Sequence, residues 1–172
     1  MSLNEEEEIK EIYARFGVAM YFAQVLEKDL VNALTVLDFL PSHLRAAASP
    51  QAWLIEVVAF MDCHFESTLG KLIRSFAAVT SVPLELEELL RQALSKRNWL
   101  AHEYFRERVT GFLTPEGRGG MIEELEDSRA LFERVAARLE ELVVPVRQRY
   151  GLTQKKIEEL QRAMIAKARG DG

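Results

Sequence analysis

The first forty residues carry a helical hydrophobic period, and this feature constrains the fold more than any other. Apolar side chains recur every three or four residues over roughly eight turns, at Ile9, Ile12, Tyr13, Phe16, Ala19, Met20, Ala23, Leu26, Leu30, Ala33, Leu34, Leu37 and Phe39. We expect this helix to be capped by Ser2 or Asn4 and to end at Leu40-Pro41, because a residue before proline is pushed out of the α region. The pattern favours one long amphipathic helix.

The remainder of the chain repeats the helical pattern between short breaks. Further helices are predicted from Pro50 towards Val79 with a break allowed near 61–65, from Pro83 or Leu84 to about Thr110, over about 121–144 with Pro145 kinking or ending it, and over 154–169. Residues 114–120 have the composition of a turn. No alternating strand pattern is visible, so we predict an all-α fold of four to five helices in an up-and-down bundle. Residues 1–150 would form the bundle and 151–172 a helical extension of the same domain.

Length and composition narrow the class of protein. A chain of 172 residues is expected to form one domain with its own core. The single cysteine, Cys63, cannot form an intramolecular disulfide. The chain opens without a basic segment followed by an apolar run, and the apolar stretch over 52–61 is interrupted by Glu56 and too short to span a bilayer. We therefore expect a cytoplasmic protein without membrane contact.

The charge balance limits how the protein could bind nucleic acid. The formal net charge is −5 at pH 7. Proteins that bind nucleic acid through its phosphates need a basic surface, because affinity comes from phosphate neutralisation and counterion release. Any contact with nucleic acid would therefore have to be local, at a small basic site on an acidic protein.

The segment SKRNWLAHEYF, residues 95–105, departs from the plain amphipathic pattern. On a continuous helix, Arg97 would lie in the middle of the stripe of leucines, with Tyr104 two turns along the same line. Asn98 and His102 would form an i, i+4 pair on its flank. A guanidinium within an apolar stripe costs several kcal/mol unless it is paired or hydrated. The position of Arg97 therefore calls for an explanation.

Two interpretations of this segment stay open. In the structural one, Arg97 pairs with Asp62 or Glu66 on a neighbouring helix, and His102 is a hydrogen-bonded core residue. In the functional one, Arg97, Asn98 and His102 converge on an anion. Arginine donates two parallel hydrogen bonds to a phosphate, and histidine ordinarily titrates near neutral pH. Those two side chains suit cleavage of an RNA phosphodiester without a metal ion.

The segment also resembles a known family. Arg97-Asn98-Trp99-Leu100-Ala101-His102 matches the Arg-x4-His signature of HEPN domains, and with Tyr104 the pattern Arg-x4-His-x-Tyr resembles the HepT toxins of MNT–HEPN toxin–antitoxin systems. The resemblance implies a four- or five-helix bundle, often a metal-independent endoribonuclease, that dimerises so that two motifs meet in one cleft. It implies neither a metal nor another cofactor.

The resemblance also assigns roles to residues. His102 would be the general acid or base, Arg97 would hold the scissile phosphate, and Asn98 would orient the phosphate or His102. Tyr104 matches the tyrosine to which a cognate nucleotidyltransferase antitoxin adds AMP, although core packing explains a tyrosine here equally well.

A homodimer would also bring basic side chains together around the motif. Lys96 and Arg106, with Arg108, would then form a local positive cleft for RNA. The rival hypothesis is a non-catalytic helical interaction module that holds a partner protein or a nucleotide. A metal site at Asp62 and Glu66 is disfavoured, because the Glu-x-x-His pair of di-iron bundles is absent from the sequence.

Overall fold

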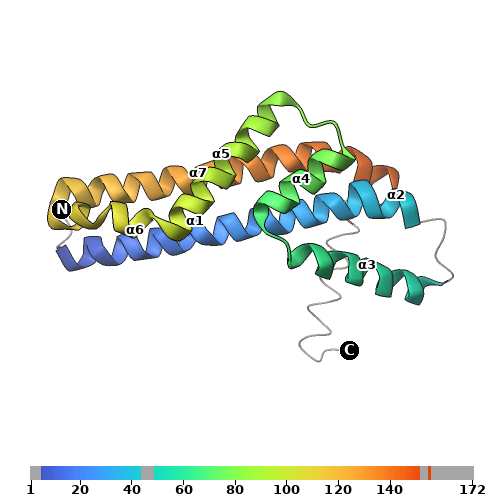
Figure 1. Ribbon diagram of the computed structural model, residues 1–172, viewed down its shortest axis with the longest axis horizontal. Coiled ribbons are helices and arrows are strands. Elements are labelled where there is room, and N and C mark those ends of the chain that lie inside the picture. Colours follow the sequence, from blue (N-terminus) through green and yellow to red (C-terminus); the bar gives the residue numbers. More distant parts are fainter. Residues whose placement is uncertain (1–4, 44–48, 152–154, 156–172) are drawn as a thin grey trace.

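The computed structural model describes residues 5–43, 49–151 and 155, and all regular structure among these residues is helical (Figure 1). The all-α prediction is therefore confirmed. The α-helices are α1 (Glu5–Leu34), α2 (Leu40–His43), α3 (Pro50–Phe65), α4 (Leu69–Val79), α5 (Leu84–His102), α6 (Tyr104–Glu107) and α7 (Pro115–Arg149). A π-helical segment, η1 (Thr35–Phe39), joins α1 to α2, and a 3-10 segment, η2 (Val109–Leu113), precedes α7.

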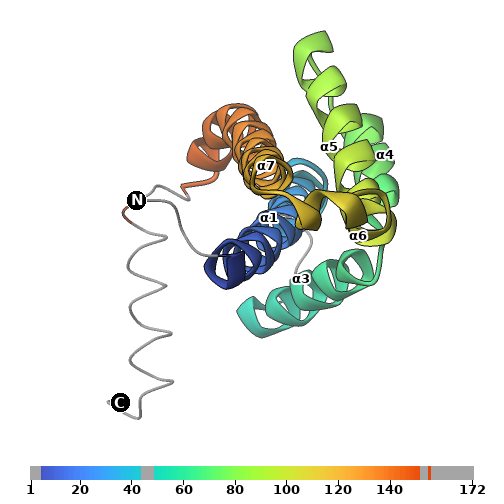
Figure 2. The ribbon, with the colours of Figure 1, turned by 90° about the vertical axis from the view of Figure 1, so that its left-hand side faces the viewer.

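The centre of the fold is a pair of long helices, α1 and α7, that pack side by side and run in the same direction (Figure 1). Ion pairs between Arg118 and Glu8 near their N-terminal ends, and between Arg15 and Glu126 further along, follow this parallel register. Seen from one end, α1 lies between α7 on one side and α4 with α5 on the other, while α3 covers part of a third side (Figure 2). The hydrophobic period of the first forty residues is thus buried on several faces.

The sequence predicted that the first helix ends at Leu40-Pro41, and this prediction is wrong. The chain stays helical from Glu5 to His43, and the segment before the proline widens to a π-helix in which the Leu40 N–H bonds to the Thr35 carbonyl. Proline lacks an N–H and its ring clashes with the carbonyl four residues earlier. The wider π turn offers room for that ring, so the helix passes through Pro41 instead of stopping.

The break in the second predicted helix lies slightly later than expected, at 66–68. Thr68 caps α4 by accepting a hydrogen bond from the Lys71 N–H at 3.4 Å. Pro145 lies inside α7 and does not end it, since the helix continues to Arg149. Apart from residue 155, the predicted helix over 154–169 falls outside the described residues, and so does most of the predicted extension over 151–172.

The turn predicted over 114–120 is wrong, because residues 115–120 are the first turns of α7. Thr114 is the N-cap and accepts a hydrogen bond from the Gly117 N–H at 3.1 Å, while Pro115 occupies the first helical position. These two residues start a helix strongly enough that the glycines after them do not interrupt it. Gly117 serves packing, because it lies directly against the backbone of Gly111 in η2.

α3 is the least buried of the longer helices. Among its described side chains only Val57, which is 8% exposed, is buried, and it contacts η1 through Trp53 and Phe60, whose rings lie 6.3 and 5.2 Å from the ring of Phe39. Its outer face exposes apolar side chains, namely Leu54, Ile55, Val58 and Phe65. No described helix is long and apolar enough to cross a bilayer.

Candidate functional site

The motif residues Arg97, Asn98 and His102 all come from the last two turns of α5. The buried face of this helix is formed by Leu86, Leu89, Leu90, Ala93 and Leu100. Arg97 lies at the edge of that face and not in its middle, which corrects the expectation from the sequence. Because Leu89 and Ala93 are also buried, the centre of the buried face lies to one side of Arg97. The guanidinium therefore reaches the protein surface.

The partner of Arg97 is an acid from the first helix. Its Nη2 atom lies 3.2 Å from Oε1 of Glu27 on α1, and its Nη1 atom donates to Oδ1 of Asn98 at 3.3 Å. The side chain of Arg97 keeps 29% of its surface exposed. Asp62 and Glu66, the predicted ion-pair partners, are exposed on α3 and at its C-terminal end. That prediction is therefore wrong, because α5 packs against α1 and α1 supplies the acid.

His102 is the last residue of α5 and is exposed, as is Asn98 one turn before it. The interpretation of His102 as a buried core histidine is therefore wrong. The helix ends here because Glu103 leaves the helical conformation, with φ −123° and ψ −26°. The imidazole is thus open to solvent and to a ligand.

Tyr104 is separated from the motif by the break at Glu103 and points into the core. The residue is 1% exposed, and its hydroxyl donates a hydrogen bond to the Met121 carbonyl at 3.2 Å. Its ring stacks on Phe16 at 5.8 Å and meets Trp99 edge-on at 5.0 Å. Burial raises the pKa of the Tyr104 hydroxyl, so the group stays protonated. In this conformation the hydroxyl is closed to modification, and the packing role is the one that the contacts support.

A basic and aromatic cluster lies next to the motif. The Lys96 ammonium lies 4.5 Å from the centre of the Trp99 ring, and the Arg108 guanidinium carbon lies 5.1 Å from it. Trp99 is held in place by a hydrogen bond from its Nε1 atom to Glu107 at 2.8 Å. Cations over an indole face are attracted by its quadrupole. The cluster therefore gathers two positive charges one helical turn from His102.

The other predicted basic residue, Arg106, is exposed and pairs with Glu103. Arg108 bonds to Glu124 through two hydrogen bonds of 2.8 Å, which raise the pKa of its guanidinium and keep it charged. Each of these arginines therefore already has an acidic partner. The surface around the motif is mixed in charge, and a phosphate would have to displace or share those carboxylates.

The structure brings together only some of the residues that the sequence singled out. Arg97 contacts Asn98, and His102 follows Asn98 on the same side of α5, whereas Tyr104, Asp62 and Glu66 lie elsewhere. Sequence reasoning missed Glu27 and Trp99. Glu27 is 70 residues from Arg97, and only the fold pairs them. The sequence did contain a signal for Trp99, because aromatic residues between basic residues are typical of nucleic-acid contacts.

Within the described ranges, no group of three or more His, Cys, Asp or Glu side chains is arranged to hold a metal ion. Compared with protein-family models, curated proteins and solved structures, the chain shows no significant match. The function must therefore be argued from the geometry of the chain itself.

Proposed function

We propose that the protein is a HEPN-like RNA-binding protein that acts as a homodimer and cleaves RNA without a metal ion, in a toxin–antitoxin or defence system. The observation that carries the proposal is the exposed pair of Asn98 and His102 beside a partly exposed Arg97 at the C-terminal end of α5. A histidine and an arginine are the groups needed to move a proton and to hold a phosphate.

In the proposed reaction, the His102 imidazole accepts the proton of a ribose 2′-hydroxyl as that oxygen attacks the adjacent phosphorus. The bond from phosphorus to the 5′-oxygen breaks, and this oxygen takes a proton from a general acid. Arg97 balances the negative charge that builds up on the phosphate oxygens. The products are a 2′,3′-cyclic phosphate and a 5′-hydroxyl end.

The geometry of α5 supports a dimeric site. Arg97 and His102 are five residues apart, which places their side chains about 140° apart around the helix and about 7.5 Å apart along it. Two side chains placed in this way do not readily meet on one phosphate within a single copy. A second copy would set its own His102 or Arg97 opposite the first, and one histidine could then serve as base and the other as acid.

Two further expectations concern the basic residues near the motif and Tyr104, and they differ in how well they agree with this site. Lys96 and Arg108, held over Trp99, would guide RNA phosphates towards the motif. Addition of AMP to Tyr104 by a nucleotidyltransferase antitoxin would require the buried ring to leave the core. The proposal therefore rests on Arg97, Asn98 and His102 and does not depend on Tyr104.

Replacing His102 by alanine is expected to abolish cleavage, because no other imidazole belongs to the motif. Purified protein would be incubated, in EDTA, with total RNA and with a structured tRNA, and the cleaved ends would be analysed for 2′,3′-cyclic phosphate. The matched control is His64→Ala, which removes a histidine on α3 whose Nδ1 contacts the Phe60 carbonyl at 2.9 Å. This control should keep the wild-type rate.

Three results would count against the proposal. Intact RNA with every protein would reject a ribonuclease that acts alone. Equal cleavage by His102→Ala and wild type would place the chemistry elsewhere. A monomer by light scattering at the concentration of the assay, together with full activity, would reject the dimeric site.

Replacing Glu27 by glutamine is expected to strengthen RNA binding several-fold, because it frees Arg97 from its carboxylate while preserving the shape of the side chain. Binding would be measured by fluorescence anisotropy with a labelled single-stranded RNA at low salt. Glu11→Gln is the control, since Glu11 lies on the same helix and pairs with Arg15 at 2.5 Å. An unchanged or weaker affinity in Glu27→Gln would mean that Arg97 does not bind RNA.

A second candidate, the non-catalytic interaction module, is favoured by one observation. The outer face of α3 exposes Leu54, Ile55 and Val58. A chain of this class would leave RNA intact under every condition above while keeping its fold. The His102→Ala comparison therefore separates the two candidates.

A further inference from the structure

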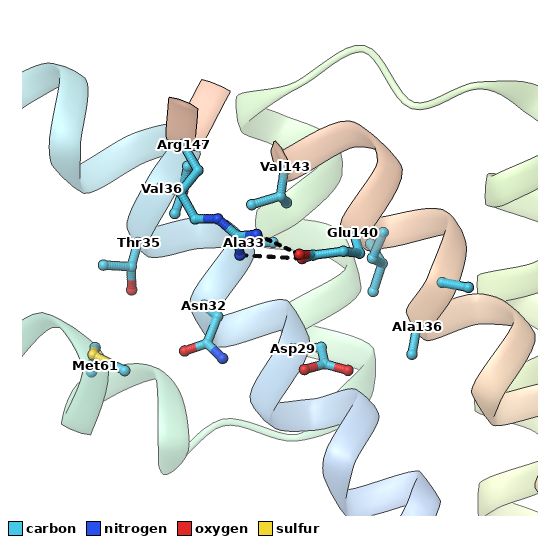
Figure 3. Close-up of a pocket in the computed structure, with 12 residues that line it drawn as sticks. Asp29, Asn32, Ala33, Thr35, Val36, Met61, Ala136, Glu140, Val143 and Arg147 are labelled. Carbon is cyan, nitrogen blue, oxygen red and sulfur yellow. Dashed lines mark hydrogen bonds and ion pairs between the residues drawn. The ribbon is translucent and has the colours of Figure 1, made fainter. Parts of the chain in front are cut away.

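A cavity of about 660 Å³ lies between α1 and the C-terminal half of α7, away from the motif (Figure 3). α1 contributes Asp29 and Asn32, η1 contributes Thr35, and α7 contributes Glu140 and Arg147. Its apolar wall consists of Ala33, Val36, Met61, Ala136, Ala137, Leu139 and Val143. Neither Arg97 nor His102 lines the cavity, so any ligand here would be bound independently of the proposed function.

Asp29 is the group in the cavity that lacks a partner. Its side chain is partly buried, and it makes no hydrogen bond or ion pair with any other residue of the described part of the chain. Burial, followed by the charge of Glu140, raises the pKa of this carboxyl. A carboxylate that has lost water without gaining a cation is an unfavourable arrangement. Asp29 would be stabilised by a cation placed in the cavity.

The one guanidinium that lines the cavity does not meet this need. Arg147 is bound to Glu140, with its Nη2 2.5 Å from Oε1 and its Nη1 3.4 Å from Oε2 (Figure 3). Its Nε atom is buried and has no acceptor among the described residues. Arg147 thus neutralises Glu140 and leaves Asp29 uncompensated. The three charged side chains of the cavity carry a net charge of about −1 when ionised.

The neighbours of Asp29 add polar groups and an apolar surface. The Thr35 hydroxyl lines the cavity and donates to the Val31 carbonyl at 2.9 Å. Asn32 is exposed at the edge of the cavity, one helical turn from Asp29 on α1 (Figure 3). Among the apolar lining residues, Met61, Ala136 and Ala137 keep exposed surface, whereas Val36, Leu139 and Val143 are buried. The site therefore combines one carboxylate and a neighbouring amide with an accessible apolar surface.

We infer that this cavity binds a small primary alkylamine, with its ammonium on Asp29 and its alkyl chain against the apolar wall. An ammonium donates up to three hydrogen bonds, of which Asp29 and the amide of Asn32, one helical turn away, can accept two and water the third. An alkyl chain of four or five carbons would cover Met61, Ala136 and Ala137, the apolar lining residues that keep exposed surface. A simple inorganic cation would leave those residues uncovered.

The binding test uses pentylamine as the probe and 1-pentanol as an uncharged probe of equal length. In ¹⁵N-labelled full-length protein, pentylamine is expected to shift the amide signals of Asp29, Thr35 and Glu140 saturably, and pentanol is expected not to. Asp29→Asn should weaken the amine at least tenfold. The control Asp38→Asn alters a half-buried acid of η1 that does not line the cavity, and should bind like wild type.

Absence of saturable shifts in the wild type would overturn the inference. Equal affinity of wild type and Asp29→Asn would also overturn it, and so would equal binding of pentanol, which would indicate a purely apolar pocket. None of these outcomes bears on RNA cleavage, so the two proposals fail separately.

Asp29→Asn should also raise the melting temperature at pH 7. A cooperative melting transition would at the same time confirm that the variant folds. Because the pKa of Asp29 is higher in the folded state than its ordinary value of about 3.9, stability is lost as the pH rises through that raised pKa. Asparagine does not ionise, so the variant does not lose this stability. A melting temperature below that of wild type at pH 7 would contradict the unpartnered carboxylate.

Discussion

Gly117→Ala is expected to destabilise the protein by about 1–3 kcal/mol. A Cβ atom at this position would lie 2.8 Å from the Cα of Gly111 and still closer to its carbonyl oxygen. Both contacts are with backbone, which cannot rotate away as a side chain would. The start of α7 would have to separate from η2, and the N-cap hydrogen bond between Gly117 and Thr114 would be strained.

The neighbouring glycines provide matched controls for this result. Gly119 and Gly120 lie in the same helical turn, and a Cβ atom at either one would meet nothing within 4 Å. Gly119→Ala and Gly120→Ala should therefore stabilise the protein by about 0.5–1 kcal/mol each, since alanine is the better helix former. Urea unfolding followed by circular dichroism would measure all three variants. Loss of stability in all three would mean that the segment is not helical.

Arg118→Met should be the most destabilising single substitution near this end of the fold, at about 3 kcal/mol. The Arg118 side chain is 6% exposed, with Nε 2.5 Å from Glu8 and Nη1 donating to the Phe112 carbonyl at 2.7 Å. Methionine keeps most of the volume, but it leaves the Glu8 carboxylate and that carbonyl without their donor. The uncompensated charge dominates the cost.

Two comparisons separate the buried charge from loss of packing. Arg91→Met removes a 71% exposed arginine that pairs with Glu88, and should cost less than about 1 kcal/mol. Adding Glu8→Gln to Arg118→Met removes the stranded charge, so the double variant should be more stable than Arg118→Met alone. Chemical denaturation of the four proteins would measure the differences. A double variant that is less stable than Arg118→Met would show that Glu8 has no unmet charge.

These two positions also show where sequence reasoning failed. The composition Thr-Pro-Glu-Gly-Arg-Gly-Gly is typical of a turn, yet Thr114 and Pro115 are also a helix start, and the start determined the outcome. Glycine is needed at position 117 because η2 crosses α7 closely at Gly111. That crossing is a tertiary contact, and nothing in the local sequence announces it.

The long-range periodicity was the more reliable guide. The apolar spacing over residues 9–39 predicted a helix, and the structure buries Ile12, Leu26 and Leu30 of that set completely. The same spacing could not show that the helix would pass through Pro41, since a π turn depends on how neighbouring elements hold the chain.

For the candidate site, the sequence located the segment but not its surroundings. Asn98 and His102 are on the same exposed side, as helical geometry predicts. The partner of Arg97 was assigned to α3, whereas α1 provides it through Glu27. Helical geometry placed Tyr104 on the apolar stripe, at the angle of Leu86, and both side chains are buried, so the core-packing alternative for Tyr104 is confirmed.

The sparse burial of α3 has a consequence for how the protein unfolds. α1 and α7 share a long apolar contact, whereas the described side chains of α3 add to the core only Val57, which is 8% exposed, and the partly buried Trp53, Phe60 and Met61. Little free energy therefore holds α3 in place. We expect its amide hydrogens to exchange through a local opening that costs less free energy than global unfolding. The protein then unfolds in two units. The pair α1 and α7 opens only on global unfolding, whereas α3 detaches and rebinds while that pair stays folded.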